Sequence, residues 1–313
     1  MSERCRFAPT PSGPAHPGTL LAALLCWLDA RSRAAQLQLR LEDVDHTRCT
    51  PEHSEQMRAA LRWLGLDWDA ESVQSERRAA HEAALDALAT QGLVYPCKCN
   101  RSEIRAHAQR AADGGWRYPG SCRERPLPAR GWRECREALR LRLPAGRVSL
   151  RDETGLDLSQ DPLAEMGDPV LRRRDGAIAY HLAVVVDDAA DAVTRIVRGR
   201  DLAPSSAIHR VLQRSLGLPE PVTRHHLLLL AHEGGKLAKL HGAVGWAELR
   251  ARMSGGEACA FLAAAAGLGS GCERVTPRDL VSEFDWSRVH EQDQVVRWSG
   301  ERLELLGPSP SER

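Results

Sequence analysis

The stretch Arg6–Leu20, with the sequence RFAPTPSGPAHPGTL, decides the fold. The apolar run around its start predicts a strand over Arg4–Ala8, and the Ala- and Leu-rich segment after it predicts a helix over Thr19–Arg31. The Pro, Ser, Thr and Gly residues between them predict a tight turn. Such a turn presents backbone N–H groups and the positive end of a helix dipole to an anion. Because His16 adds a donor and Gly18 permits close approach to the backbone, the stretch predicts a nucleotide site.

Further segments alternate between predicted strands and helices. The predicted strands are Gln38–Leu41, Ile178–Val186, Thr194–Gly199 and Arg224–Leu230, and the predicted helices are Pro51–Trp63, Glu76–Gln91 and Pro204–Leu216. This alternation predicts an α/β fold with a parallel sheet and a ligand at its carboxyl edge. The second and third of these strands are expected near the centre of the sheet. Residues 245–305 predict short helices, and we expect the tail 307–313 to be disordered.

An insertion rich in Arg, Gly and Pro is predicted from about Tyr95 to about Leu150. Residues 101–150 hold twelve Arg against five acidic residues, although the net charge of the whole chain is only +1. Such a segment is either a solvated surface or a surface that faces phosphates.

The insertion also holds four of the nine cysteines. Cys97 and Cys99 form a Cys-x-Cys pair, and Cys122 follows, which gives three thiolates where Zn²⁺ takes four ligands. His107 is the conventional candidate for the fourth ligand, and Cys135 is another. Unrelated free thiols are the alternative.

Lysine is rare in this chain. There are 43 basic residues, but only three are Lys, and Lys236 and Lys239 lie together in the pentapeptide KLAKL. A compact ammonium group binds phosphates as a point charge, so the pair predicts a phosphate contact. A solvated loop is the alternative.

Composition limits the location of the protein. The N-terminus has no apolar segment of the kind found in signal peptides, and no apolar run has the length of a membrane span. An odd number of cysteines without regular spacing argues against a disulfide framework. We therefore expect a cytoplasmic protein with no membrane or DNA partner, and we expect a monomer.

Two of these motifs together resemble the class I aminoacyl-tRNA synthetases. His16–Leu20 is similar to their HIGH motif, and Lys236–Leu240 is similar to their KMSKS loop, with Ala238 where the motif usually has Ser. Arg6–Gly13 followed by Arg40–Asp45 resembles the glutamyl and glutaminyl branch. The resemblance implies a Rossmann-like parallel sheet with a zinc-bearing insertion and a short helical C-terminal region.

The expected organisation follows from this resemblance. The two halves of the catalytic domain are expected at residues 1–94 and 151–240, the insertion at 95–150 and the helical region at 241–313. Only 73 residues follow Leu240, so we expect no anticodon-binding domain. In this the chain resembles the family of glutamyl-Q tRNA(Asp) synthetases.

That resemblance implies a ligase that modifies tRNA. It would activate glutamate with ATP to glutamyl-AMP without tRNA, and transfer the glutamyl group to queuosine at the wobble position of tRNA(Asp). The alternatives are a short glutamyl-tRNA synthetase that charges a 3′ end, a zinc-bearing RNA-binding protein with a decayed site, and a nucleotidyltransferase.

The resemblance also implies the roles of individual residues. Arg6 would bind a substrate carboxylate and Glu42 the substrate ammonium group. The implied glutamate ligands are Arg6, Phe7, Ala8, Pro9, Thr10, Glu42, Tyr180 and Arg198. The implied ATP ligands are His16, Gly18, Thr19, Lys236 and Lys239, of which His16, Gly18 and Lys239 are catalytic, with Mg²⁺ expected on ATP. Tyr118 is implied as the fourth ligand, beside His107 in reserve, of one structural Zn²⁺. Read without the family, Tyr180 is a core aromatic residue and Arg198 a structural ion pair.

Overall fold

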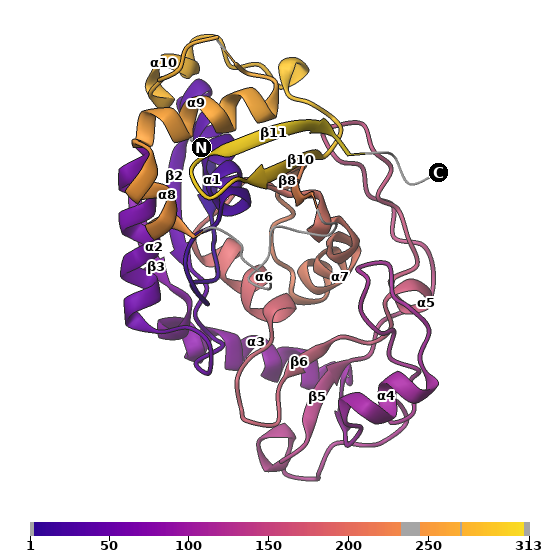
Figure 1. Cartoon of the computed structure of the whole chain (residues 1–313). Coiled ribbons are helices and arrows are strands. Elements are labelled where there is room, and N and C mark those ends of the chain that lie inside the picture. Colours follow the sequence, from indigo (N-terminus) through magenta and orange to yellow (C-terminus); the bar gives the residue numbers. More distant parts are fainter. Residues whose placement is uncertain (1–2, 233–244, 270, 310–313) are drawn as a thin grey trace. The chain divides into compact units, whose positions relative to one another are not determined.

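The chain folds into two compact units (Figure 1). The computed structural model describes residues 3–232, 245–269 and 271–309. Unit 1 consists of Met1–Val73, Arg195–Arg200 and Thr223–Arg313, and unit 2 of Gln74–Thr194 and Asp201–Val222. The chain therefore passes from one unit to the other four times. No helix within the described ranges is both long and apolar enough to cross a membrane.

Unit 1 contains the predicted parallel sheet. Its strands are β1 (Arg4–Phe7), β2 (Gln36–Leu41), β3 (Ala70–Val73), β7 (Arg195–Gly199) and β8 (Val222–His226). Their order is β3-β2-β1-β7-β8, and β1 pairs in parallel with both β2 and β7. The strand predicted over Thr194–Gly199 is confirmed as β7, next to β1.

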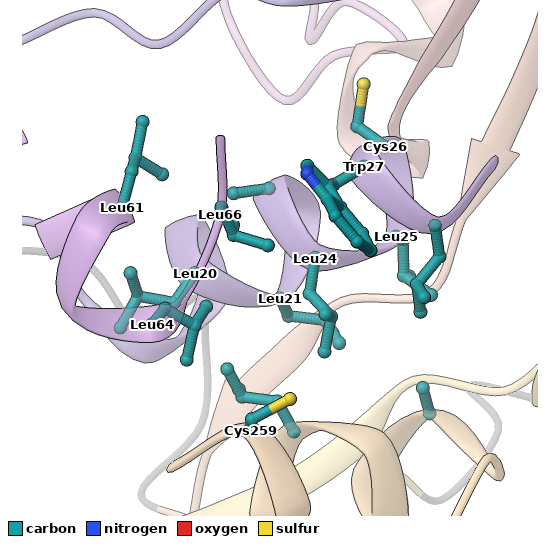
Figure 2. Packing of buried hydrophobic residues seen from close by; sticks show 14 of the residues in the cluster. Leu20, Leu21, Leu24, Leu25, Cys26, Trp27, Leu61, Leu64, Leu66 and Cys259 are labelled. Carbon is teal, nitrogen blue, oxygen red and sulfur yellow. The ribbon is translucent and has the colours of Figure 1, made fainter. Parts of the chain in front are cut away.

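Helix α1 (Pro17–Ser32) lies at the centre of the core of unit 1. It begins with Pro at its first position, where a missing N–H costs nothing, and the His16 side chain caps it. Its side chains are buried nearly all round, and they pack against α2 (Pro51–Leu64) and α9 (Gly255–Ala266). Figure 2 shows Leu20, Leu24 and Trp27 in this cluster, with Cys259 of α9 opposite.

A glycine permits the contact between α2 and α9. A Cβ atom at Gly255 would lie 1.8 Å from the backbone oxygen of Trp63, at the end of α2. No larger residue fits there unless the backbone moves. The two helices can therefore approach closely enough to enclose Leu61 and Leu64.

The C-terminal part of unit 1 differs from the prediction. The helices are α8 (Trp246–Arg252), α9, α10 (Pro277–Val281) and the 3₁₀ turn η4 (Trp286–Arg288), as expected in kind. A second sheet of order β11-β10-β9 was not predicted; its strands are β9 (Leu229–Ala231), β10 (Gln294–Trp298) and β11 (Leu303–Pro308).

Two predictions are therefore wrong in this region. The strand predicted over Arg224–Leu230 is divided between two sheets, because β9 pairs in parallel with β10. The tail was expected to be disordered from residue 307, but β11 extends to Pro308. The partner of β9 lies more than sixty residues further along the chain, and a local sequence pattern cannot show such a pairing.

Unit 2 is mixed in structure. Its helices and 3₁₀ turns are η1 (Gln74–Arg77), α3 (Arg78–Thr90), α4 (Arg101–His107), η2 (Trp132–Glu134), α5 (Pro162–Glu165), α6 (Tyr180–Ala190) and α7 (Ser206–Leu216), and η3 (Arg200–Ser205) enters it from unit 1. An antiparallel sheet of order β4-β5-β6 contains β4 (Val94–Cys97), β5 (Ala138–Leu141) and β6 (Val170–Arg172). The predicted insertion provides β5 and most of β4.

The strand predicted over Ile178–Val186 is wrong, because this segment forms the start of helix α6. Every residue from Leu182 to Val186 is buried in the core of unit 2. A continuous apolar run fits a strand buried on both faces and a helix buried all round equally well. Tertiary contacts decide between them here, and they overrule the β-branched character of three successive Val residues.

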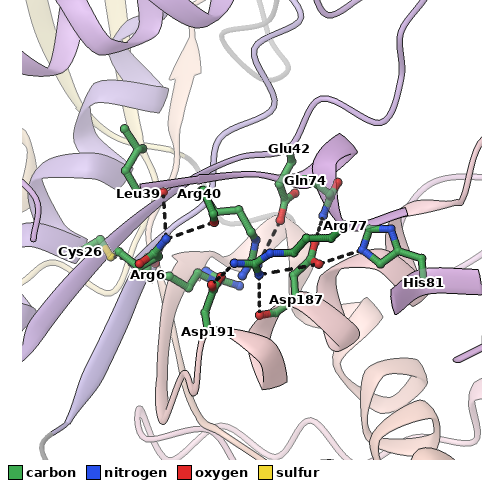
Figure 3. Close-up of polar contacts among 12 residues, drawn as sticks. Arg6, Cys26, Leu39, Arg40, Glu42, Gln74, Arg77, His81, Asp187 and Asp191 are labelled. Atoms are coloured by element: carbon green, nitrogen blue, oxygen red, sulfur yellow. Dashed lines mark hydrogen bonds and ion pairs between the residues drawn. The ribbon is translucent and has the colours of Figure 1, made fainter. Parts of the chain in front are cut away.

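A buried polar network holds the C-terminal end of α6. The carboxylate of Asp187 accepts hydrogen bonds from Gln74 Nε2 at 2.7 Å and pairs with His81 Nε2 at 2.8 Å. Arg77 forms an ion pair with Asp191 one turn later. Figure 3 shows this group converging on Asp187. The network joins η1 and α3 to α6, so it fixes the helix that begins at Tyr180.

Candidate functional site

Three predicted site residues lie at the carboxyl edge of the parallel sheet. Arg6 is on β1, Glu42 follows β2 directly, and Arg198 is on β7. Their exposed fractions are 4%, 5% and 5%. Because β1 lies between β2 and β7 and is parallel to both, the ends of these three strands meet at one edge. The sequence thus places two buried cations and one buried anion there, and buried charges require partners.

Glu42 has a partner that the sequence analysis gave no role. Arg40 is fully buried, and its guanidinium lies 3.3 Å from the Glu42 carboxylate. Figure 3 shows the two side chains on the same strand end. The backbone N–H of Glu42 also donates to the carbonyl of Pro9 at 3.0 Å, which ties together the loops after β1 and β2. The available signal was Arg40 itself, a charged residue inside an otherwise buried strand.

Arg198 also has a partner that was missed. Its Nε–H donates to Nε2 of His225 at 2.9 Å, and His225 is a buried residue of β8. The accepting nitrogen has no proton, because an imidazole nitrogen cannot donate and accept at once. The contact therefore orients Arg198 without neutralising its charge. The signal was the pair His225-His226 near the start of the strand predicted over Arg224–Leu230.

The turn between β1 and α1 has the predicted form. Nδ1 of His16 accepts the backbone N–H of Thr19 at 3.3 Å, which caps the helix. A Cβ atom at Gly18 would lie 3.1 Å from the His16 ring, so glycine leaves room for that ring. Phe7 and Ala8 are half-buried, Pro9 is buried and Thr10 is exposed. Exposure of Thr10 leaves its hydroxyl available at the turn.

Lys236, Ala238 and Lys239 lie outside the described residues. Tyr180 belongs to unit 2, where it is the first residue of α6. Its half-buried ring meets that of His209 edge-on, with the ring centroids 5.5 Å apart.

A buried ion pair fixes β7 in the sheet. Asp29 of α1 accepts hydrogen bonds from Nε of Arg195 at 2.6 Å and from the indole N–H of Trp286 at 2.6 Å. Asp29 is 1% exposed and Arg195 is 3% exposed. The pair joins the central helix, the strand that holds Arg198 and turn η4. The sequence analysis missed it, although an Asp inside the apolar run of α1 was the signal.

The three cysteines Cys97, Cys99 and Cys122 meet in unit 2. Their sulfur atoms lie within 4.8 Å of one another, and the Cys99 and Cys122 sulfurs are 3.6 Å apart. The hydroxyl oxygen of Tyr118 lies 3.4 Å from Cys97 Sγ and accepts the backbone N–H of Cys122 at 2.8 Å. The three thiols therefore form a group of the kind that holds Zn²⁺, and the phenol oxygen of Tyr118 lies beside it.

The two other candidates for the fourth metal ligand are not members of this group. Within the described residues, neither His107 nor Cys135 belongs to this group of ligand atoms. His107 borders a groove of about 360 Å³ together with Lys98 and Cys99. Cys135 is buried in the main core of unit 2.

The thiols of the cluster differ in acidity. Burial would raise the pKa of Cys122, but hydrogen bonds from the backbone of Lys98 and from Tyr118 outweigh it and lower the pKa to about 7. Burial raises the pKa of Cys99 to about 11. Burial, together with its bond to Cys97, also raises the pKa of Tyr118. The cluster thus contains one thiol that ionises near neutral pH, and a thiolate is the form that binds metal.

Comparison with known proteins agrees with this geometry. Residues 3–291 match the family model described as "tRNA synthetases class I (E and Q), catalytic domain". A glutamyl-Q tRNA(Asp) synthetase of Symbiobacterium thermophilum is 41% identical over 96% of this chain and 97% of its own length. One of Bordetella bronchiseptica is 49% identical over 76% of this chain and 75% of its own.

A solved structure is similar to nearly the whole of this chain. The glutamate tRNA ligase of Elizabethkingia meningosepticum, solved with its amino acid, is 25% identical with a TM-score of 0.77. The similarity covers 94% of this chain and 67% of that one. The parallel sheet, the order of the motifs and the length of the matches all indicate the same family. The chain belongs to the class I tRNA synthetase family of ligases for glutamate and glutamine.

Proposed function

We propose that this protein activates glutamate with ATP and transfers the glutamyl group to queuosine at the wobble position of tRNA(Asp). The observation that supports activation of glutamate is the edge where Arg6, Glu42 and Arg198 meet, because glutamate has two carboxylates and one ammonium group. The choice of queuosine as acceptor is supported by relatives of that name that match nearly the whole chain. We propose the cytoplasm as the site of the reaction, because its proposed substrates ATP and tRNA are available there.

In this proposal the buried charges bind the amino acid. Arg6 and Arg198 pair with the carboxylates, since the guanidinium fork suits bidentate pairing. Glu42 takes the ammonium group, and the ion pair with Arg40 holds the Glu42 carboxylate in place. Tyr180 is proposed as a further glutamate ligand, because the family resemblance implies this role.

The turn before α1 serves ATP in this proposal. The backbone N–H of Gly18, at the positive end of the helix, and the ring of His16 face the nucleotide, and Lys236 and Lys239 neutralise the phosphates together with Mg²⁺. An oxygen of the substrate α-carboxylate attacks the α-phosphorus, pyrophosphate leaves and glutamyl-AMP forms. A hydroxyl of the queuosine cis-diol then attacks the acyl carbon and AMP leaves. The protein contributes position and electrostatics, with no protein nucleophile.

The cysteine cluster would hold one structural Zn²⁺. Cys97, Cys99, Cys122 and Tyr118 fit it, because they supply four donors and leave no position for a substrate. The metal would fasten the end of β4 to the loop around Tyr118, a segment with few other apolar contacts.

Removal of one thiol tests the metal site. In Cys122→Ser we expect the zinc content to fall from about one ion per chain to less than half, and the unfolding temperature to fall by several degrees. Atomic absorption and thermal unfolding measure the two. Cys135→Ser is the matched control and should keep its zinc. Equal zinc in the Cys122 variant and the wild type would refute the cluster as a metal site.

The transfer reaction is tested with labelled glutamate, ATP and three RNAs: bulk tRNA, tRNA from cells that lack queuosine, and a queuosine-containing anticodon stem-loop of tRNA(Asp). Label on the stem-loop and none on queuosine-free tRNA supports the proposal. Label on queuosine-free tRNA that maps to the 3′-terminal adenosine would make the protein a short glutamyl-tRNA synthetase instead, the activity that the similar glutamate tRNA ligase structure favours.

A further inference from the structure

The twelve arginines of residues 101–150 fall into different groups in the structure. Six pair with carboxylates, namely Arg123, Arg125, Arg130, Arg133, Arg142 and Arg147. Arg140 is buried and lies over the ring of Tyr118. Within residues 74–194, all of which the structure describes, the other five form no ion pair, and four of these five lie between Arg101 and Arg117. Most arginines of the insertion that form no ion pair within residues 74–194 therefore lie in one short segment, residues 101–117.

Two of these four arginines contact an exposed tryptophan. The guanidinium carbon of Arg110 lies 4.2 Å from the centre of the Trp116 ring, and that of Arg105 lies 5.6 Å from it. Trp116 is 38% exposed. Arg105 and Arg110 are themselves exposed. We call Arg105, Arg110 and Trp116 the Trp116 platform.

Local hydrogen bonds fix the positions of Arg110 and Trp116 in this platform. Arg110 and Trp116 form an antiparallel bridge, and the N–H of Arg117 donates to the carbonyl of Gln109 at 3.0 Å. The Arg110 guanidinium also donates to the carbonyl of Gly114 at 2.9 Å. Arg110 and Trp116 are thus ordered before any ligand arrives, which reduces the entropy lost on binding.

The same insertion contains an Arg–Trp pair of the opposite kind. Arg133 lies 4.3 Å from the centre of the Trp132 ring, but Trp132 is only 6% exposed and Arg133 pairs with Asp86. Stacking on tryptophan therefore serves packing at Trp132, where charge and ring are both satisfied inside the protein. At the Trp116 platform the ring is 38% exposed and the guanidinium groups form no ion pair within residues 74–194, and an exposed aromatic ring beside unneutralised guanidinium groups matches an unpaired nucleotide.

We infer that the Trp116 platform is an RNA-docking site of this protein, which stacks an unpaired nucleotide on Trp116 and binds the adjacent phosphates with Arg105 and Arg110. The inference rests on the proposed function for the identity of the RNA as a tRNA. The guanidinium donors bind phosphate oxygens in a fixed fork, and the indole face accepts any base, so the site reads structure in preference to sequence.

The test is the affinity for fluorescein-labelled tRNA, measured by anisotropy over a range of salt concentrations. We expect Trp116→Ala to weaken binding roughly tenfold or more, since stacking of a base is worth that much, and Trp116→Phe to restore most of it. Arg105→Gln and Arg110→Gln should each lower the slope of log affinity against log salt by about 1. Arg133→Gln is the matched control and should bind as the wild type does. Zinc content and tRNA-free pyrophosphate exchange should stay unchanged in all four platform variants.

Three results would overturn the inference: wild-type tRNA affinity in Trp116→Ala, an equal loss in Arg133→Gln, or an equal loss of affinity for a fully paired RNA duplex. The first would leave the platform as a contact for a protein partner. If the wild type binds tRNA through Trp116 but transfers no glutamate to queuosine, the proposed function fails and the docking site stands.

Discussion

Glu42→Gln is expected to lower glutamate-dependent ATP–pyrophosphate exchange by roughly a hundredfold or more, because removal of one partner from a buried charge pair costs a large part of the binding energy. Glu42 is 5% exposed, so water cannot replace its carboxylate as the partner that we propose for the substrate ammonium group. The amide keeps the size of the side chain but loses the charge. The expected change is a rise in the KM for glutamate together with a fall in kcat, at an unchanged KM for ATP.

The ion pair with Arg40 makes a second measurement necessary. Loss of the Glu42 charge leaves the buried Arg40 guanidinium without that partner, which could lower stability as well as activity. Thermal unfolding separates the two effects, because a folded but inactive variant identifies a substrate ligand. Glu71→Gln is the control, since Glu71 lies on the neighbouring strand β3, pairs with Arg58 of α2 and has no part in the proposed site, so this variant should keep full exchange. Normal exchange in Glu42→Gln would exclude Glu42 as the ammonium ligand.

Asp29→Ala is expected to lower the free energy of unfolding by about 3–5 kcal/mol, which is a large fraction of the stability of a typical domain. The variant leaves the Arg195 guanidinium and the Trp286 indole N–H without their shared acceptor inside the core. Urea unfolding followed by tryptophan fluorescence and circular dichroism measures the loss. The double variant Asp29→Leu with Arg195→Met should recover much of it, because an apolar pair of similar volume avoids the buried charge.

The chain provides a close control for this experiment. Asp67 also accepts from an arginine and an indole, Arg31 and Trp27, but it is half-exposed. Water can replace its partners, so Asp67→Ala should cost about 1 kcal/mol or less. Equal losses in Asp29→Ala and Asp67→Ala would mean that burial does not decide the strength of the Asp29 pair.

The sequence predicted those parts of the fold that local signals determine. Pro17 and the cap at His16 mark the start of α1, and Gly65 in a left-handed conformation ends α2 close to its predicted end at Trp63. The parallel sheet could be predicted because strand patterns alternate with helix patterns along the chain. Of the site, Arg6, Glu42 and Arg198 were anticipated from the resemblance to the synthetases, and the order of the strands brings them to one edge of the sheet.

The parts that were missed depend on contacts between distant segments. Strands β9 and β10 acquire their structure from each other, and α6 is helical because the core of unit 2 surrounds it. Three of the missed residues depend on their partners: Arg40 pairs with Glu42 at the end of its own strand, His225 accepts from Arg198, and Arg195 pairs with Asp29. A single sequence does not reveal which buried charged residue contacts which partner. Sequence patterns give the type of an element better than the identity of its neighbours.

The position of β7 in the chain has a consequence for synthesis. β1 finds its neighbour β2 about thirty residues later, but its other neighbour spans Arg195–Gly199, beyond the first segment of unit 2. At 5–20 residues per second, a ribosome needs roughly 8–30 s to reach that strand. During this interval one edge of β1 has unpaired backbone groups beside an Ala- and Leu-rich helix, a combination prone to aggregation. Nascent chains should therefore depend on chaperones most between the completion of β2 and the arrival of β7.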